Sequence, residues 1–216
     1  MNANSRTITT NQRGIHDALE KQVQRHLKHP FQRPVSAYQQ RIFEEVDQVR
    51  GEHPQPLILD SGCGVGESTR WLADQFPDHW VLGIDKSAHR LAKGKTSGAN
   101  FRIVRADLID FWLQAAAAGW EVKRHYLLYP NPYPKATHLK RRWHGHPIFT
   151  SLIQLGEYVE VRSNWRIYVE EFQYAYQRAT GITGQINLFV PRPPVTPFER
   201  KYHRSGQSLY QLIIRR

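Results

Sequence analysis

Residues 57–72 read LILDSGCGVGESTRWL. The short apolar run LILD is typical of a strand that is buried inside a sheet. Glycines follow at 62, 64 and 66, and they predict a tight turn whose backbone a ligand can approach closely. The letters ESTRWLADQF, residues 67–76, then have a helical pattern. The stretch therefore predicts a strand, a glycine loop open to a ligand, and a helix in direct succession.

The same alternation continues on the C-terminal side. We expect further strands at 80–85, 101–106, 125–130 and 157–162, and further helices at 87–95, 108–118, 147–155 and 165–179. Strands that alternate with helices predict βαβ units and a parallel sheet. Two last strands, 184–190 and 208–216, are expected to form an antiparallel pair. No repeat or linker divides this region, so the pattern predicts one α/β domain.

The N-terminal side has a different character. Residues 1–14 lack the apolar core of a secretory signal and are expected to form a disordered tail. Within residues 15–50, apolar residues recur at every fourth position of a first helical pattern, and Ser36 is placed to cap a second helix. We therefore expect residues 15–50 to form helices that pack on a main domain of residues 51–216.

Composition narrows the class of partner. The 30 Lys and Arg residues exceed the 19 Asp and Glu residues, which gives a formal net charge of +11. An excess of this size favours a polyanionic partner, either nucleic acid or an anionic membrane face, although a generally basic surface explains charge alone equally well. The single cysteine, Cys63, excludes an internal disulfide and fits a cytoplasmic protein. No apolar run is long enough to span a membrane, and we expect no membrane partner.

The glycine loop indicates the type of ligand. A nicotinamide dinucleotide site requires Gly or Ala at position 67, where this chain has Glu67. The pattern acid-x-G-x-G-x-G resembles instead the class I S-adenosylmethionine (AdoMet) methyltransferases. That resemblance implies a Rossmann-like, seven-stranded, mostly parallel sheet with helices on both faces and an antiparallel C-terminal strand. The cofactor residues that it implies are Asp60, Gly62 and Gly64 in the loop, Asp85 at the ribose hydroxyls, and Asp107 with Leu108 at the adenine.

A second stretch, YPNPYPKATHLKRRWHGHP at 129–147, follows the fourth expected strand. Its X-Pro steps disfavour helix and predict a stiff segment beside the cofactor. No Asp or Glu occurs from Val122 to Gly156, which suits RNA better than a small substrate. Its three histidines have neither a cysteine nor an acid alongside, so we expect no metal. Tyr133 and Trp143 are candidates for stacking on an everted base.

This stretch resembles the signature of the tRNA (guanine-N7)-methyltransferases, P-D-P-aromatic-x-K followed by H-x-K-R-R. The chain has PNPYPK from Pro130 and HLKRR from His138, and the family's T-x-F-E motif occurs as Thr196-Pro197-Phe198-Glu199. The resemblance runs from about Leu57 to Leu212. It implies methyl transfer to guanine N7 in tRNA by a monomer or homodimer. The substrate-binding residues that it implies are Tyr133, Lys135, His138, Lys140, Arg141, Arg142, Thr196 and Glu199.

Two positions depart from the family pattern. Asn131 stands where the family has Asp, and Asn164, in Ser163-Asn164-Trp165, stands where the family has the Asp of T-D-W. By resemblance these two are the catalytic positions that line the acceptor pocket. An Asn side chain offers both an acceptor and donors, whereas an ionised Asp only accepts. The alternatives are therefore a divergent paralogue that methylates another RNA base or an exocyclic or side-chain amide nitrogen, and a catalytically weak RNA-binding paralogue.

Overall fold

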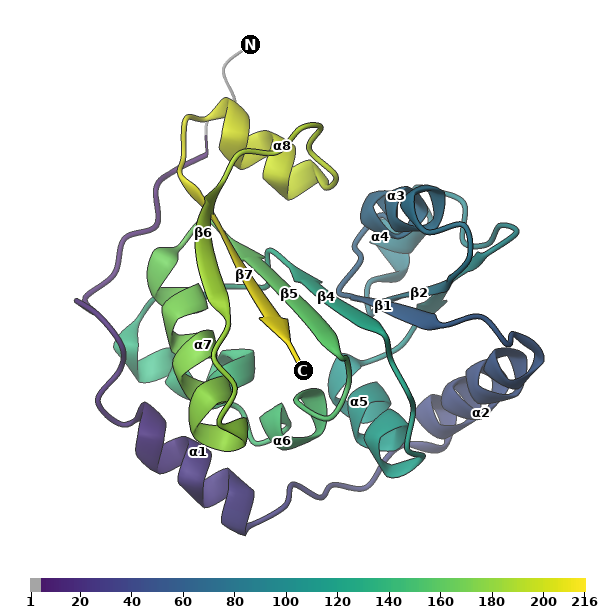
Figure 1. The fold of residues 1–216 in the computed structure, drawn as a ribbon, viewed down its shortest axis with the longest axis horizontal. Coiled ribbons are helices and arrows are strands. Elements are labelled where there is room, and N and C mark those ends of the chain that lie inside the picture. The colour runs from purple at the N-terminus through teal and green to yellow at the C-terminus, as the bar shows by residue number, and fades with distance from the viewer. Residues whose placement is uncertain (1–4) are drawn as a thin grey trace.

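The computed structural model describes residues 5–216, and a single seven-stranded sheet forms its centre (Figure 1). The strands lie in the order β3-β2-β1-β4-β5-β7-β6. Their bounds are β1 Leu57–Ser61, β2 Trp80–Asp85, β3 Phe101–Arg105, β4 Arg124–Leu128, β5 Tyr158–Ser163, β6 Gln185–Phe189 and β7 Leu209–Arg215. The first five run parallel, and β7 is antiparallel to both β5 and β6. The expected mostly parallel sheet with an antiparallel C-terminal pair is confirmed.

Helices cover both faces of the sheet. The helices α2 (Ala37–Glu52), α5 (Leu108–Ala117), α6 (Phe149–Leu152) and α7 (Arg166–Thr180) lie on one face, while α3 (Glu67–Gln75) and α4 (Ala88–Leu91) lie on the other. The helix α1 (Leu19–Lys28) packs on α7 outside the sheet, and α8 (Pro197–Arg204) stands beyond the end of β6 (Figure 1). Among residues 5–216, no helix combines the length and apolar character that crossing a bilayer requires.

Alternation along the strands divides the core in two. In β1, Leu57 and Leu59 belong to the larger cluster under α2, α5 and α7, whereas Ile58 packs with Leu72 of α3 on the opposite face. Successive strand residues point to opposite faces, so a strand covered on both sides reads as a continuous apolar run. For this reason the apolar run LILD predicts the central strand β1.

The N-terminal segment differs from the expectation. Residues 1–4 lie outside the described residues, and residues 5–14, expected to be disordered, follow an extended path along the side of the molecule (Figure 1). The Thr10 hydroxyl donates a hydrogen bond to Pro134 O, and the Gln12 amide donates one to Glu171. The segment is held because polar partners on the core satisfy its side chains. The expected cap at Ser36 accepts the Gln39 N–H at the start of α2.

Several short elements of the structure also differ from those expected from the sequence. The expected helices at 87–95 and 147–155 contract to the single turns α4 and α6. The basic stretch after β4 contains two 3₁₀ helices, η1 (Ala136–Arg141) and η2 (Trp143–Gly145). The helix α8, which the sequence pattern did not predict, begins at the T-x-F-E motif because Thr196 caps it and a proline occupies its first turn.

Candidate functional site

The glycine loop turns sharply over the carboxyl ends of β1 and β2. The N–H groups of Gly62 and Cys63 both donate to Ile84 O, at 2.8 and 3.1 Å. A Cβ on Gly66 would come within 2.3 Å of Ile103 Cδ1, so only glycine lets α3 begin this close to β3. Gly62 and Gly64 have φ of 82° and 62°, which the turn requires and which side chains disfavour.

Asp60 lies beneath this loop with its side chain fully buried. Its Oδ2 accepts hydrogen bonds from the hydroxyls of Ser68 and Thr69, at 2.6 and 2.7 Å. Its Oδ1 has no partner among the described residues. Burial raises the pKa of Asp60 from 3.8 to about 6, against the opposing effect of the two hydroxyls. A buried acceptor without a partner beside an open glycine loop suits a cationic or hydrogen-bond-donating ligand.

The other expected cofactor residues lie next to the loop. The Asp85 carboxylate, 3% exposed, accepts the Gly64 N–H at 3.0 Å and the Arg90 guanidinium at 2.9 Å. Asp107 caps α5 and accepts a hydrogen bond from Arg33 at 3.0 Å. Leu108 Cδ1 would lie 3.9 Å from a Cβ at Gly62. Acids therefore stand at or just after the carboxyl ends of three neighbouring strands, at the same end of the sheet as the glycine loop.

The acidity of Asp60 leads to a prediction about stability. The folded protein holds this proton up to about pH 6, and the unfolded chain releases it near pH 4. The contribution of Asp60 to stability is therefore greatest below pH 4 and is lost as the pH rises through 6. We expect the free energy of unfolding to decrease by about 3 kcal/mol across this interval from this group. Urea denaturation at pH 4 and pH 7 measures the change, and Asp60→Asn is expected to abolish it. The same substitution at the exposed Asp74 is the control, and an identical pH dependence in Asp60→Asn would contradict the prediction.

The segment after β4 is fixed at its start by a buried cluster of charges. The Tyr129 hydroxyl donates to Glu199 Oε1 at 2.9 Å, and the Arg162 guanidinium binds the same oxygen at 2.8 Å. Glu199 also accepts the Val195 N–H at 2.6 Å. Burial, with Glu199 next in importance, raises the pKa of Tyr129 above its usual range, so its hydroxyl stays protonated and donates. Tyr129 has a φ of 55°, a conformation that such surroundings must enforce.

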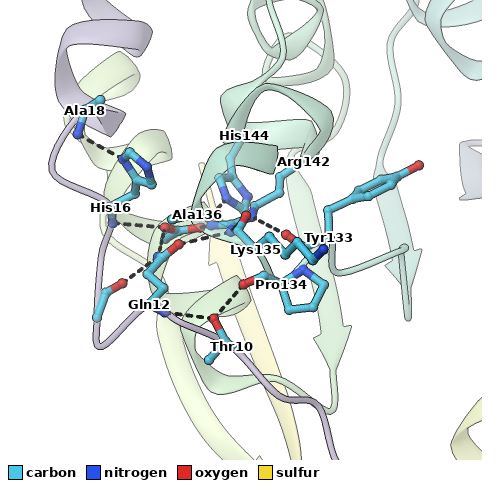
Figure 2. A network of polar contacts seen from close by, with 12 residues as sticks. Thr10, Gln12, His16, Ala18, Tyr133, Pro134, Lys135, Ala136, Arg142 and His144 are labelled. Atoms are coloured by element: carbon cyan, nitrogen blue, oxygen red, sulfur yellow. Dashed lines mark hydrogen bonds and ion pairs between the residues drawn. The ribbon is translucent and has the colours of Figure 1, made fainter.

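The same segment is fixed at its other end by Arg142. Its guanidinium is fully buried, forms an ion pair with Glu171 of α7, and donates to the carbonyls of Tyr133 and Lys135, at 3.2 and 3.1 Å (Figure 2). His144 binds the same Glu171 oxygen at 2.9 Å. The expectation that Arg142 meets a phosphate is therefore wrong in this structure, because the side chain is fully buried and its guanidinium donates to protein groups. From the interior, Arg142 holds the backbone of the segment at Tyr133 and Lys135.

Glu171 also joins the N-terminal segment to this cluster. Its Oε1 accepts the Gln12 amide at 2.5 Å and the His16 N–H at 3.0 Å, while its Oε2 binds Arg142 (Figure 2). His144, Arg142 and their hydrogen bonds outweigh burial and hold the pKa of Glu171 near 2. One buried carboxylate thus ties the start of α1, the basic stretch and α7 together.

The remaining expected substrate residues are divided between this segment and α8. Asn131 is exposed between Pro130 and Pro132, and Tyr133, with a φ of 45°, follows it. Lys135, Lys140 and Arg141 are exposed, and the half-buried His138 packs edge-on against Tyr133. Trp143 packs on Trp112, with ring centroids 4.7 Å apart, rather than standing free. Thr196, which caps α8, and Glu199, in its first turn, are both buried. The Arg200–Glu67 ion pair of 2.9 Å ties α8 to the helix after the glycine loop.

Three residues that hold the candidate site together belong to no sequence motif. Arg162 and Gln207 give no sequence signal, because each depends on contacts that are distant along the chain. Glu171 offers one signal, since it is an acid within the apolar stripe of α7 that contains Tyr168, Phe172 and Ala175. Cys63 is buried, and burial raises its pKa, in agreement with a loop residue that is no nucleophile.

Comparisons with known proteins agree with this arrangement. A model of the family described as "Putative methyltransferase" matches residues 54–212. A tRNA (guanine-N(7)-)-methyltransferase of Actinobacillus pleuropneumoniae is 30% identical over 81% of this chain and 74% of its own. One of Paraburkholderia xenovorans is 28% identical over 74% of this chain, and the match spans 66% of the relative's length.

Solved structures share the fold. A structure described as an antibiotic-related methyltransferase has a TM-score of 0.59 and 14% identity, over 86% of this chain and 97% of its own. The 16S rRNA methyltransferase KamB has a TM-score of 0.57 and 17% identity, over 84% of this chain and 94% of its own. Sheet order, glycine loop and matches together define a class I methyltransferase, whose cofactor is S-adenosylmethionine. Within that class, the chain belongs to the family of the tRNA (guanine-N7)-methyltransferases.

Proposed function

We propose that this protein transfers the methyl group of AdoMet to N7 of a guanine in tRNA. The observation that carries the proposal is the rigid, acid-free segment 129–142, which follows β4 at the same sheet edge as the glycine loop. AdoMet would supply an electrophilic methyl group on a sulfonium. Asp60, Gly62 and Gly64 would hold its amino acid part, Asp85 its ribose, and Asp107 with Leu108 its adenine.

The chemistry requires positioning more than proton transfer. Guanine N7 carries a lone pair and no proton, so the site needs no general base. The task of the protein is to hold the base in line with the methyl group and to exclude water. Both ends of the segment 129–135 are anchored, by Glu199 with Arg162 and by Arg142, and that rigidity supports a positioning role. Lys135, Lys140 and Arg141 would contact phosphates, and Tyr133 with His138 would line the base pocket.

The hydrogen bonds of Asn164 support a specific role for its carbonyl. Gln207 donates its amide group to the carbonyls of Ser5 and Arg6, at 3.0 and 3.2 Å, so its own oxygen points toward Asn164. The Asn164 amide donates to that oxygen at 2.8 Å. The Asn164 Oδ1 is then left to accept a hydrogen bond from guanine. In this protein a neutral acceptor would replace the carboxylate of the family pattern.

Asn164→Asp is therefore expected to reduce activity rather than restore it. An ionised aspartate has no N–H to donate, so it would lose the hydrogen bond to the Gln207 oxygen and repel that oxygen. We therefore expect about tenfold lower kcat/KM for tRNA. Steady-state methyl transfer measures the change. Asn187→Asp, in β6 and outside the proposed site, is the matched control and is expected to leave kcat/KM unchanged. Equal or higher activity in Asn164→Asp would show that Gln207 does not set the role of Asn164.

Substitution of the acceptor atom tests the proposal itself. Transcribed tRNA made with 7-deazaguanosine keeps every Watson–Crick donor and acceptor of guanine but has carbon in place of N7. We expect methyl transfer to ordinary transcripts and none to the deaza transcripts, while both bind with similar affinity. Transfer to the deaza transcripts would assign the methyl group to another atom and contradict the proposal.

A further inference from the structure

The helix α1 presents a stripe of cations directly opposite its buried face. Leu19, Val23 and His26 are buried, and Lys21, Arg25 and Lys28, at the same spacing of four and then three residues, are exposed. That spacing places three side chains on one line along a helix. The three cations, called the α1 stripe below, form no ion pair among residues 5–216.

The α1 stripe lies beside the basic stretch after β4. The helix contacts both α7 and η2. Its His26 has a pKa lowered to about 4, by burial first and then by the charges of Arg25, His146 and Lys140. The 3₁₀ helix η2, which α1 contacts, also contacts η1, and η1 carries the exposed Lys140 and Arg141. The exposed cations of α1 and of η1 therefore lie on neighbouring elements.

No acid among residues 5–216 forms an ion pair with the α1 stripe or with Lys140 and Arg141. Glu20, on the flank of α1, turns toward α7, where its carboxylate accepts the Tyr174 hydroxyl at 2.9 Å and pairs with Arg178 at 3.4 Å. Glu171, which lies between α1 and the basic stretch, is fully buried and has its charge satisfied by Arg142. In the segment before α1, the Gln12 amide and the His16 N–H both donate hydrogen bonds to Glu171. The helix is therefore fixed to the rest of the protein.

We infer that the α1 stripe is a docking surface for the phosphate backbone of the RNA substrate, continuous with the segment that presents the base. The inference rests on the proposed RNA substrate and adds a contact region outside residues 54–212, to which the family match is confined. A row of unpaired cations neutralises phosphates without reading sequence. Leu19 and Val23 of α1 are already packed on the protein and are not available for insertion into a bilayer.

The test compares two lysine pairs of equal charge. Lys21→Gln/Lys28→Gln removes two cations from the α1 stripe, and Lys93→Gln/Lys95→Gln removes two exposed lysines beyond α4, on the opposite face of the sheet. Affinity for unmodified tRNA transcripts is measured from 50 to 300 mM salt, with circular dichroism to check folding. We expect the slope of log affinity against log salt to become shallower by about 1.5 in the first variant only. Its affinity at low salt is expected to decrease at least tenfold.

Methyl transfer separates this inference from the proposed function. In the α1 stripe variant, KM for tRNA is expected to rise at least tenfold while kcat stays within twofold, because the stripe binds RNA away from the reacting base. Unchanged slope and affinity would overturn the inference, and so would an equal loss in both variants, which indicates a generally basic surface. Charge-dependent binding to anionic vesicles but not to tRNA would also overturn it. If the slope changes as expected but wild type methylates no tRNA, the docking surface stands and the proposed function falls.

Discussion

Replacing Asp85 by alanine is expected to weaken AdoMet binding at least ~100-fold and to abolish detectable methyl transfer. Two ribose hydroxyls that bind one buried carboxylate contribute roughly 3 kcal/mol together, which corresponds to that factor. The substitution also removes the acceptor of the Gly64 N–H, so the glycine loop loses one of its fixed points. Isothermal titration calorimetry measures the affinity, and the rate of transfer to tRNA measures turnover.

Asp78→Ala provides the matched control. The Asp78 side chain is 79% exposed and binds the neighbouring His79, so AdoMet affinity is expected to stay unchanged. The Asp85→Ala variant also separates an enzyme from a pure binder, because its tRNA affinity is expected to remain close to wild type. An AdoMet affinity within threefold of wild type would show that Asp85 does not hold the ribose.

Replacing Glu171 by alanine is expected to destabilise the protein by about 3–5 kcal/mol. The substitution leaves the Arg142 guanidinium buried without its counterion, and the cost of breaking a buried pair from one side is of this size. It also frees Gln12 and His16, so the start of α1 loses its anchor. Urea denaturation followed by circular dichroism measures the free energy of unfolding.

The neighbouring residue on α7 supplies the control for Glu171. Glu170 forms an exposed i,i+4 pair with Arg166 at 2.7 Å, and Glu170→Ala is expected to cost no more than about 0.5 kcal/mol. The two adjacent glutamates both have arginine partners, but Glu171 is fully buried and also binds Gln12, His16 and His144. Similar costs for the two substitutions would mean that the cluster around Glu171 does not hold the basic stretch in place.

Local patterns were sufficient to predict the sheet. Apolar runs such as LILD and the glycines at 62, 64 and 66 act within a few residues, so strand, turn and helix follow from neighbouring letters. The antiparallel end of the sheet was predicted for the same reason. The single turns α4 and α6 were overestimated, since a helical pattern does not reveal where the chain must turn back to the sheet.

The interior of the candidate site could not be predicted in the same way. In the sequence, Arg142 is the last of three cations in HLKRR and looks like its exposed neighbour Arg141. Its burial depends on Glu171, which lies 29 positions later on another helix. Segment 5–14 presents a similar case, because its order depends on Glu171 and Pro134 rather than on its own composition. Charges that are paired through the fold cannot be distinguished from surface charges by spacing alone.

Nucleoside analysis after reaction shows directly whether the protein methylates guanine N7 in tRNA. Purified protein, labelled AdoMet and unmodified total tRNA are incubated, the RNA is digested to nucleosides, and the labelled product is identified by mass spectrometry. We expect labelled 7-methylguanosine from wild type and none from Asp85→Ala. A different labelled nucleoside, or none under conditions where AdoMet and tRNA both bind, would contradict the proposed function.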